Sequence, residues 1–279
     1  MKAKSVRKKL EEMNLLDDFL FGSVVTYPEI GQRFVKILLK TIFGKEFKHL
    51  SVTAQKIYHG ADTYLHGARL DVYLEPEEAE EQVTVYDIEP DLKDNASDIR
   101  ALPRRIRFYH GKIAARSLDS GTDYDKLKNV VIIMIMPYDP FGLDRMVYTV
   151  KNKCVEVPDM KYEDGAGTLF LYTKGTVGIP SEAVEQLLHY MENTTYENAV
   201  NKELREVHRM VETVKRDPEV VGMYIQLVED VIKLSEENVK LTEENAKMTE
   251  ENAKMAEELI KLRSELARKE SEEKSSPAT

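Results

Sequence analysis

A seven-residue repeat near the end of the chain restricts its folding more than any other sequence feature. From residue 233 the segments KLSEENV, KLTEENA, KMTEENA and KMAEELI follow one another without interruption. One heptad position carries Leu234, Leu241, Met248, Met255 and Leu262. The partner core position, four residues further on, carries Asn238, Asn245, Asn252, Leu259 and Leu266. With Glu and Lys on the flanks, this repeat predicts a long helix that forms a coiled coil.

The asparagines at the core position bear on how many helices pair. A buried Asn lowers the stability of a coiled coil but specifies its register, so we expect a homodimer first and a trimer second. The alternative is a single solvated helix. A helix of this length with an apolar seam rarely stays alone, because most helices gain their stability by packing an apolar face.

The rest of the chain divides at a change of character near residue 179. The segment Gly178-Ile179-Pro180 interrupts strand-like sequence, and Ser181 is of the residue type that caps the helical sequence following it. We expect a folded domain over 1–178, a helical segment over 179–228, the coiled coil over 229–270 and a disordered tail over 271–279.

Composition indicates a soluble, cytoplasmic protein without a membrane partner. The chain has 279 residues, 42% of them hydrophobic, which is enough to bury a sizeable core. Its one cysteine, Cys154, excludes an internal disulfide framework and fits a reducing compartment. The basic start lacks the apolar region of a signal peptide. The longest apolar run, VVIIMIMP, is much shorter than the roughly 20 residues that cross a bilayer.

The charge restricts any role with nucleic acid. The formal net charge is −10, and a protein that coats nucleic acid non-specifically is normally basic. Contact with nucleic acid must therefore be local, through a basic patch or a metal ion.

The pattern of the first 178 residues predicts an α/β fold with a mixed sheet flanked by helices. Residues 10–43 and 98–118 have helical periodicity. Residues 68–74 and 83–88 alternate around an acidic turn and predict a hairpin, and 130–136 is apolar throughout, as in a central strand. Residues 145–150 and 168–173 are further candidate strands.

Carboxylates at the end of the hairpin are the first candidate site. In YDIEPDLKD, Glu89 and Asp91 are two residues apart and point the same way if the chain stays extended. Asp71 lies on the partner strand, which can bring it within a few ångströms of Glu89. Converging carboxylates can hold a hard cation such as Mg²⁺. The alternative is a solvated polar sheet face.

A basic stripe on the following helix is the second candidate. Arg105, Tyr109, Lys112 and Arg116 are spaced four, three and four residues apart and share one helix face. Such a stripe can contact phosphates beside a metal site, or it can be one side of a solvated amphipathic helix. The six histidines and Cys154 lack zinc-ligand spacing, and no calcium loop or phosphate loop is present.

The segments GARLDVYL, VYDIEPD and LPRRIRFYHGKIAARSLDSGTDYDKLKNVVIIMIMPYDPF, together with LLDDFLFGSVV, resemble the PD-(D/E)XK nuclease family transposases, a group related to the recombination-promoting nucleases. The resemblance covers roughly residues 14–175. It implies a restriction-endonuclease-like fold with an α-β-β-β-α-β core, and a DNA endonuclease that uses Mg²⁺, or alternatively Mn²⁺.

The resemblance also implies roles for individual residues. Asp71 and Glu89 match the acidic metal ligands, and Asp18 matches an acidic residue of the first helix. Asp91 stands where the family has Lys or Gln. Asp91 is therefore a further metal ligand, or another cation, Lys112 or Arg105, has taken over the role of that residue, or the site is impaired. Arg105, Tyr109 and Arg116 are the expected DNA contacts.

Two functions remain open from the sequence. The first is a metal-dependent DNA endonuclease in which the coiled coil pairs two copies of the folded domain. The second is a catalytically degenerate nuclease fold that acts as an oligomeric DNA- or protein-binding module.

Overall fold

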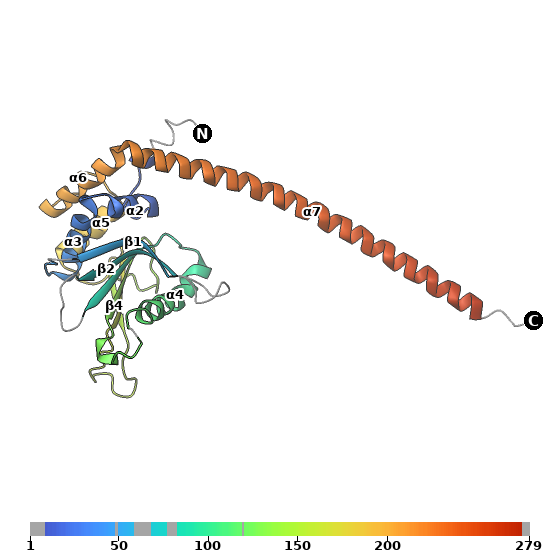
Figure 1. Ribbon diagram of the computed structural model, residues 1–279, viewed down its shortest axis with the longest axis horizontal. Helices are drawn as coiled ribbons and strands as arrows, with labels where there is room; N and C mark the ends of the chain where they lie inside the picture. Colours follow the sequence, from blue (N-terminus) through green and yellow to red (C-terminus); the bar gives the residue numbers. More distant parts are fainter. Residues whose placement is uncertain (1–8, 48–49, 59–67, 77–82, 119, 275–279) are drawn as a thin grey trace, which may run out of the picture. The chain divides into compact units, whose positions relative to one another are not determined.

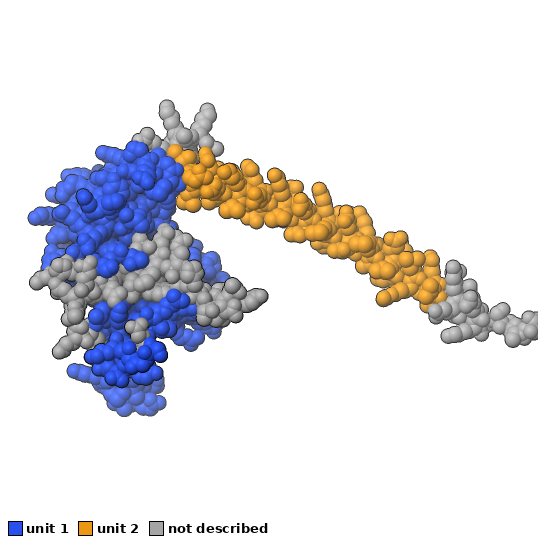
Figure 2. Space-filling view, viewed as in Figure 1, with its two compact units in different colours: residues 1–224 blue, residues 225–279 orange. Residues whose placement is uncertain are grey.

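The computed structural model describes residues 9–47, 50–58, 68–76, 83–118 and 120–274, and the side chains of all of these except 54–58, 68–76 and 268–274. The chain divides into two compact units, Met1–Tyr224 and Ile225–Thr279 (Figure 2). The first unit contains the sheet and most of the helices. The second consists of the greater part of the last helix.

The central part of the first unit has the element order α-β-β-β-α-β, from α3 to β4 (Figure 1). The strands are β1 (Leu50–Tyr58), β2 (Ala68–Pro76), β3 (Thr84–Pro90), β4 (Asn129–Met136), β5 (Val147–Lys151) and β6 (Ala166–Tyr172). The helices are α2 (Asp18–Thr26), α3 (Ile30–Phe43), α4 (Ala96–Ala114), the 3-10 helix η1 (Tyr124–Lys126), α5 (Glu182–Glu192), α6 (Lys202–Arg216) and α7 (Pro218–Lys274).

The described strands form one mixed sheet in the order β1-β2-β3-β4-β6-β5. The first three strands pair antiparallel, whereas β3, β4 and β6 run parallel and β5 closes the edge antiparallel. β3 therefore lies where antiparallel pairing changes to parallel pairing. The predicted α/β class with a mixed sheet is confirmed, and β1 is a strand that the sequence pattern did not reveal.

The two faces of the sheet are covered by different helices. Val85 and the alternate residues of β4 form a buried cluster with Leu102, Ile106 and Ile113 of α4. Tyr86, which points the other way in the period-two pattern, packs against Phe43 at the end of α3. β4 is buried on both faces, as its uninterrupted apolar sequence predicts.

Short polar signals set the ends of the helices. Asn95 caps α4, since its side chain accepts hydrogen bonds from the N–H groups of Ser97 and Asp98. The helix then continues through Pro103 to Ala114, so it starts and ends slightly before the predicted range of 98–118. The expected helical stretch 10–43 is interrupted at Pro28, between α2 and α3.

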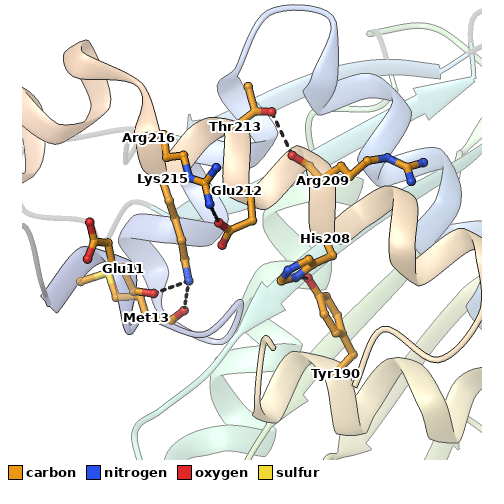
Figure 3. A network of polar contacts seen from close by, with 9 residues as sticks. All are labelled: Glu11, Met13, Tyr190, His208, Arg209, Glu212, Thr213, Lys215 and Arg216. Carbon is orange, nitrogen blue, oxygen red and sulfur yellow. Dashed lines mark hydrogen bonds and ion pairs between the residues drawn. The ribbon is translucent and has the colours of Figure 1, made fainter. Parts of the chain in front are cut away.

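A buried lysine ties α6 to the start of the described chain (Figure 3). Lys215 is 4% exposed, and its Nζ donates hydrogen bonds to the carbonyl oxygens of Glu11 at 2.9 Å and Met13 at 2.7 Å. Burial lowers the pKa of Lys215, and the charges of Glu212 and Glu11 oppose that change. On the same helix, His208 shares a 3.0 Å hydrogen bond with the hydroxyl of Tyr190 from α5.

The last helix, α7, is one element of 57 residues that begins in the first unit and makes up the described part of the second. Within the second unit, every residue from 229 to 267 is exposed, including the Leu and Met residues of the heptad repeat. The helix reaches Lys274, so part of the segment expected to be disordered is helical, and residues 275–279 lie outside the described residues. Among the described helices, none combines the length and apolar composition needed to cross a bilayer.

A glycine in the first turn of α3 provides a test of how α3 packs against the end of α2. A Cβ atom at Gly31 would lie 1.8 Å from the carbonyl oxygen of Val25, and backbone cannot move aside cheaply. We expect Gly31→Ala to lower the free energy of unfolding by about 2 kcal/mol or more. Chemical denaturation followed by circular dichroism measures the change.

Gly111→Ala is the matched control, because Gly111 is exposed in α4 and nothing lies within 4 Å of an added Cβ. This variant should gain about 0.5–1 kcal/mol from the higher helix propensity of Ala. Equal effects of the two substitutions would contradict the packing of α2 against α3.

Candidate functional site

Three carboxylates follow one another at alternate positions at the end of β3. Asp87, Glu89 and Asp91 are 0%, 8% and 4% exposed, so all three are buried. Asp91 continues the strand by one residue, since its N–H donates to the carbonyl oxygen of Ile135 in β4 at 2.8 Å. The period-two pattern puts Asp87 and Glu89 on the face of Val85, which α4 covers. The alternative of a solvated polar sheet face therefore does not describe these residues.

The register of β2 against β3 brings position 71 to this place. Val72 is opposite Ile88 and Tyr73 is opposite Asp87, so one further step sets the backbone of Asp71 across from that of Glu89. The hairpin predicted from the sequence therefore has the register that the candidate site requires. The side chain of Asp71 is outside the described part.

Asp91 forms a buried ion pair with Arg105 of α4. Arg105 Nη2 donates to Asp91 Oδ2, and the other carboxylate oxygen accepts the N–H of Lys93 at 2.9 Å. Burial lowers the pKa of Arg105, but the charge of Asp91 and the hydrogen bond to it outweigh that effect and raise the pKa overall. One of the crowded carboxylates thus has its own cation.

Tyr138, just beyond β4, is the third member of this group. Burial, followed by the charge and hydrogen bond of Asp91, raises the pKa of Tyr138 far above its ordinary value. The phenol therefore remains a neutral donor beside Asp91. Tyr138 and Asp87 did not stand out in the sequence. Asp87 could have been found because it alternates with Glu89, and Tyr138 because the carboxyl ends of parallel strands meet at one sheet edge.

The other predicted site residues are distributed around α4 and α2. Lys112 Nζ lies 5.4 Å from the ring centroid of Phe108, one turn earlier. Tyr109 packs against the buried cluster under α4, and Arg116 is exposed beyond the last residue of the helix. Asp18 is exposed at the first position of α2, after Asp17, whose side chain caps that helix.

The buried carboxylates of β3 offer suitable oxygen donors for a metal ion, but they do not form a complete ligand group among the described side chains. Carboxylate oxygens are the donors that Mg²⁺ prefers, and Glu89 with Asp87 supplies them from one strand face. Among the described side chains, however, no three or more His, Cys, Asp or Glu residues form a group that could hold a metal ion. Asp71 was not part of that set, so the predicted pair of Asp71 and Glu89 remains a prediction.

His110 has a structural environment on the inner side of α4. Its Nε2 lies 3.0 Å from the hydroxyl of buried Thr168 in β6. Burial lowers the pKa of His110, and the charge of Asp164 opposes that change. The imidazole is therefore neutral near pH 7 and links α4 to the sheet.

Comparison with known proteins gives no relative: no family model, curated protein or solved structure matches this chain. The resemblance to the PD-(D/E)XK transposases therefore stays a prediction that depends on the motifs quoted above.

The ion pair predicts a specific stability pattern. Arg105→Met leaves Asp91 buried without its cation, which should cost about 3 kcal/mol of unfolding free energy at neutral pH. The double variant Asp91→Asn, Arg105→Met removes both charges and should recover most of that loss. Urea denaturation of the two variants and the wild type measures both values.

The exposed pair of Lys126 and Asp125 is the control, with side chains 66% and 68% exposed. Lys126→Met should change stability by less than about 1 kcal/mol. If the double variant were as unstable as Arg105→Met alone, the ion pair would not explain the burial of Asp91.

Proposed function

We propose that the first unit is a metal-dependent DNA endonuclease that hydrolyses phosphodiesters. The observation that supports it most is the set of buried carboxylates at the end of β3, with position 71 opposite Glu89 in the β2–β3 register. These carboxylates lie on the side of the sheet that α4 covers, and Arg105 of α4 forms an ion pair with Asp91. The observed order α3-β1-β2-β3-α4-β4 is also the order that the resemblance implies.

The residues of the chain would have separate roles in this reaction. Asp71 and Glu89 would hold Mg²⁺ or Mn²⁺, with Asp18 of α2 as a third ligand. When bound, the metal supplies polarisation of the phosphoryl oxygen and a lower pKa for the attacking water. Arg105 pairs with Asp91 and would add positive charge where the phosphate gains negative charge. Lys112 offers a second cation on the same flank of α4.

A second function is favoured by the Asp91–Arg105 pair itself. In the resembling family a Lys or Gln stands at position 91, whereas here an acid occupies it and the nearby guanidinium neutralises that acid. A cation engaged in a buried ion pair is less able to stabilise a transition state. This supports the alternative of a degenerate nuclease fold that binds DNA or a protein without cutting.

We propose further that α7 joins two copies of the chain as a coiled coil. Its heptad seam is apolar and exposed: Leu234, Leu241, Met248, Met255 and Leu262 are each 54–58% exposed. A second copy carries the same seam and can cover it by knobs-into-holes packing. Pairing would bring two heads together, which suits cleavage of both DNA strands or the bridging of two DNA sites.

The charged flanks of the seam favour a parallel pair. Glu237, Glu244 and Glu251 precede the core asparagines, while Ser235, Thr242 and Thr249 follow the core Leu and Met residues. In a parallel two-stranded coil these two flanks face each other, so Glu meets Ser or Thr. In an antiparallel coil each flank faces its own kind, and rows of Glu would repel.

Plasmid cleavage tests the nuclease proposal. Wild-type protein with Mg²⁺ or Mn²⁺ should nick or linearise plasmid DNA, and chelation of the metal should abolish this. Glu89→Gln and Asp71→Asn should each lower the rate by about 100-fold or more, because each removes charge that holds the cation. Asp125→Asn, at an exposed residue of η1, should leave the rate unchanged.

Activity that survives both substitutions would show that the site is elsewhere. Absence of cleavage with any metal or DNA form, in a correctly folded protein that still binds DNA, would favour the binding module.

Substitution in the seam tests the coiled coil in the full-length chain. Leu241→Lys with Met248→Lys places two charges in the core and should give a monomer. Glu243→Lys with Glu250→Lys introduces the same residues outside the seam and should leave the dimer intact. Multi-angle light scattering should give twice 32.1 kDa for the wild type and the control. A monomeric wild type would contradict the prediction.

A further inference from the structure

α4 carries a row of arginines on the side that faces away from the sheet. Arg100, Arg104 and Arg107 are spaced four and three residues apart, and all three are exposed. The buried residues of the helix, Leu102, Ile106 and Ile113, lie on its other side. Figure 1 shows α4 on the opposite side of the sheet from α3 and α5. We call Arg100, Arg104 and Arg107 the arginine row.

The arginine row has no acidic partner among the described residues. Other exposed cations of the first unit do have one, such as Arg33 with Glu206 and Arg216 with Glu212. α4 contains five basic residues and one acidic residue, in a chain whose net charge is −10. Like charges at this spacing repel one another, so the row lowers the stability of the helix that carries it. A feature that costs stability points to a role in binding.

The dimensions of the row fit a phosphate backbone. Seven residues of helix rise about 10 Å, which corresponds to about three phosphates along one strand of a duplex. Arginine suits this ligand because its planar guanidinium donates two parallel hydrogen bonds to a phosphate and stays charged.

The surface between the row and the buried carboxylates is continuous along the helix. Phe108 and Lys112 lie on the flank of α4 between the arginine row and Arg105, as helical spacing dictates. Phe108 is 38% exposed and has the Lys112 ammonium over its ring. Arg105 then reaches Asp91. An exposed aromatic among cations is a surface on which a nucleic-acid base can stack.

From this geometry we propose that the arginine row and the Phe108–Lys112 flank bind the phosphodiester backbone of a nucleic acid and lead it to the carboxylates of β3. The inference rests on the proposed nuclease function for the identity of its ligand. It moves the principal phosphate contacts outward from Arg105 and Tyr109, which face Asp91 and the core. The new contacts are the arginine row and Phe108, which did not stand out in the sequence, together with Lys112, which did.

Binding measured without metal separates this inference from cleavage. Full-length protein in EDTA is titrated against a labelled duplex and a labelled single strand over a series of KCl concentrations, with fluorescence anisotropy as the readout. The triple variant Arg100→Gln, Arg104→Gln, Arg107→Gln should bind at least about tenfold more weakly at low salt. The slope of log K against log[KCl] for the duplex should fall by about 2 to 3, since each lost phosphate contact removes about 0.9.

Two further triple variants serve as controls. Lys240→Gln, Lys247→Gln, Lys254→Gln removes the same charge from exposed positions of α7 and should leave affinity and slope unchanged. Substitution of the row by three lysines retains the charge and should keep the salt slope. Far-ultraviolet circular dichroism confirms that each variant is folded.

Four results would overturn the inference: no binding of either nucleic acid by the wild type, no effect of the glutamine variant, an equal loss for the α7 control, or binding of anionic phospholipid vesicles in place of DNA. Row-dependent DNA binding without any cleavage would leave the inference standing and remove the proposed enzymatic activity. Cleavage by the wild type, together with unchanged DNA affinity in the glutamine variant, would overturn the inference and leave the proposed enzymatic activity standing.

Discussion

The ion pair between Asp91 and Arg105 is the interaction on which the geometry of the candidate site depends. It joins the end of β3 to α4, and Tyr138 beyond β4 contributes to the same group. Burial of the two charges costs several kcal/mol for each ion, and their mutual attraction must offset that cost. Packing alone therefore does not account for the pair. The ion pair does fix the rotation of α4 about its axis. Once Arg105 is held at the sheet edge, Leu102 and Ile106 must face the core.

That rotation divides α4 into three surfaces with different chemistry. The inner surface is apolar and includes His110, which is neutral because burial lowers its pKa. The flank holds Arg105 against Asp91, and the outer surface carries cations without acidic partners among the described residues. An acidic chain can approach a polyanion only where its positive charge is concentrated. The outer surface of α4 has this property, and it is connected to the buried carboxylates by the flank.

The sequence predicted the elements that have strong periodicity and left the others unidentified. The central strand, the hairpin and α4 were found within a few residues, because apolar alternation and helical spacing are properties of single segments. β1, with the sequence LSVTAQKIY, was missed because polar residues interrupt its alternation. The spacing of Arg105, Tyr109 and Lys112 correctly indicated one helix face. Spacing within one segment cannot show what lies opposite that face, and so the pairing of Arg105 with Asp91 could not be predicted.

The same distinction explains why Asp91 was difficult to interpret from sequence. A carboxylate two residues after Glu89 indicates either a further metal ligand or the loss of a catalytic lysine, since both put an acid at that position. The structure adds a third role, that of an ion-pair partner. Arg105 of α4, 14 residues further along the chain, neutralises the acid. Asp91 is engaged with Arg105, so the acids outside that ion pair are Glu89 and Asp87 on one strand and position 71, whose backbone lies across from that of Glu89. In the proposed nuclease a metal ion would therefore be held by acids outside the ion pair, and Asp87, to which the resemblance assigned no role, is a buried acid on the same strand face.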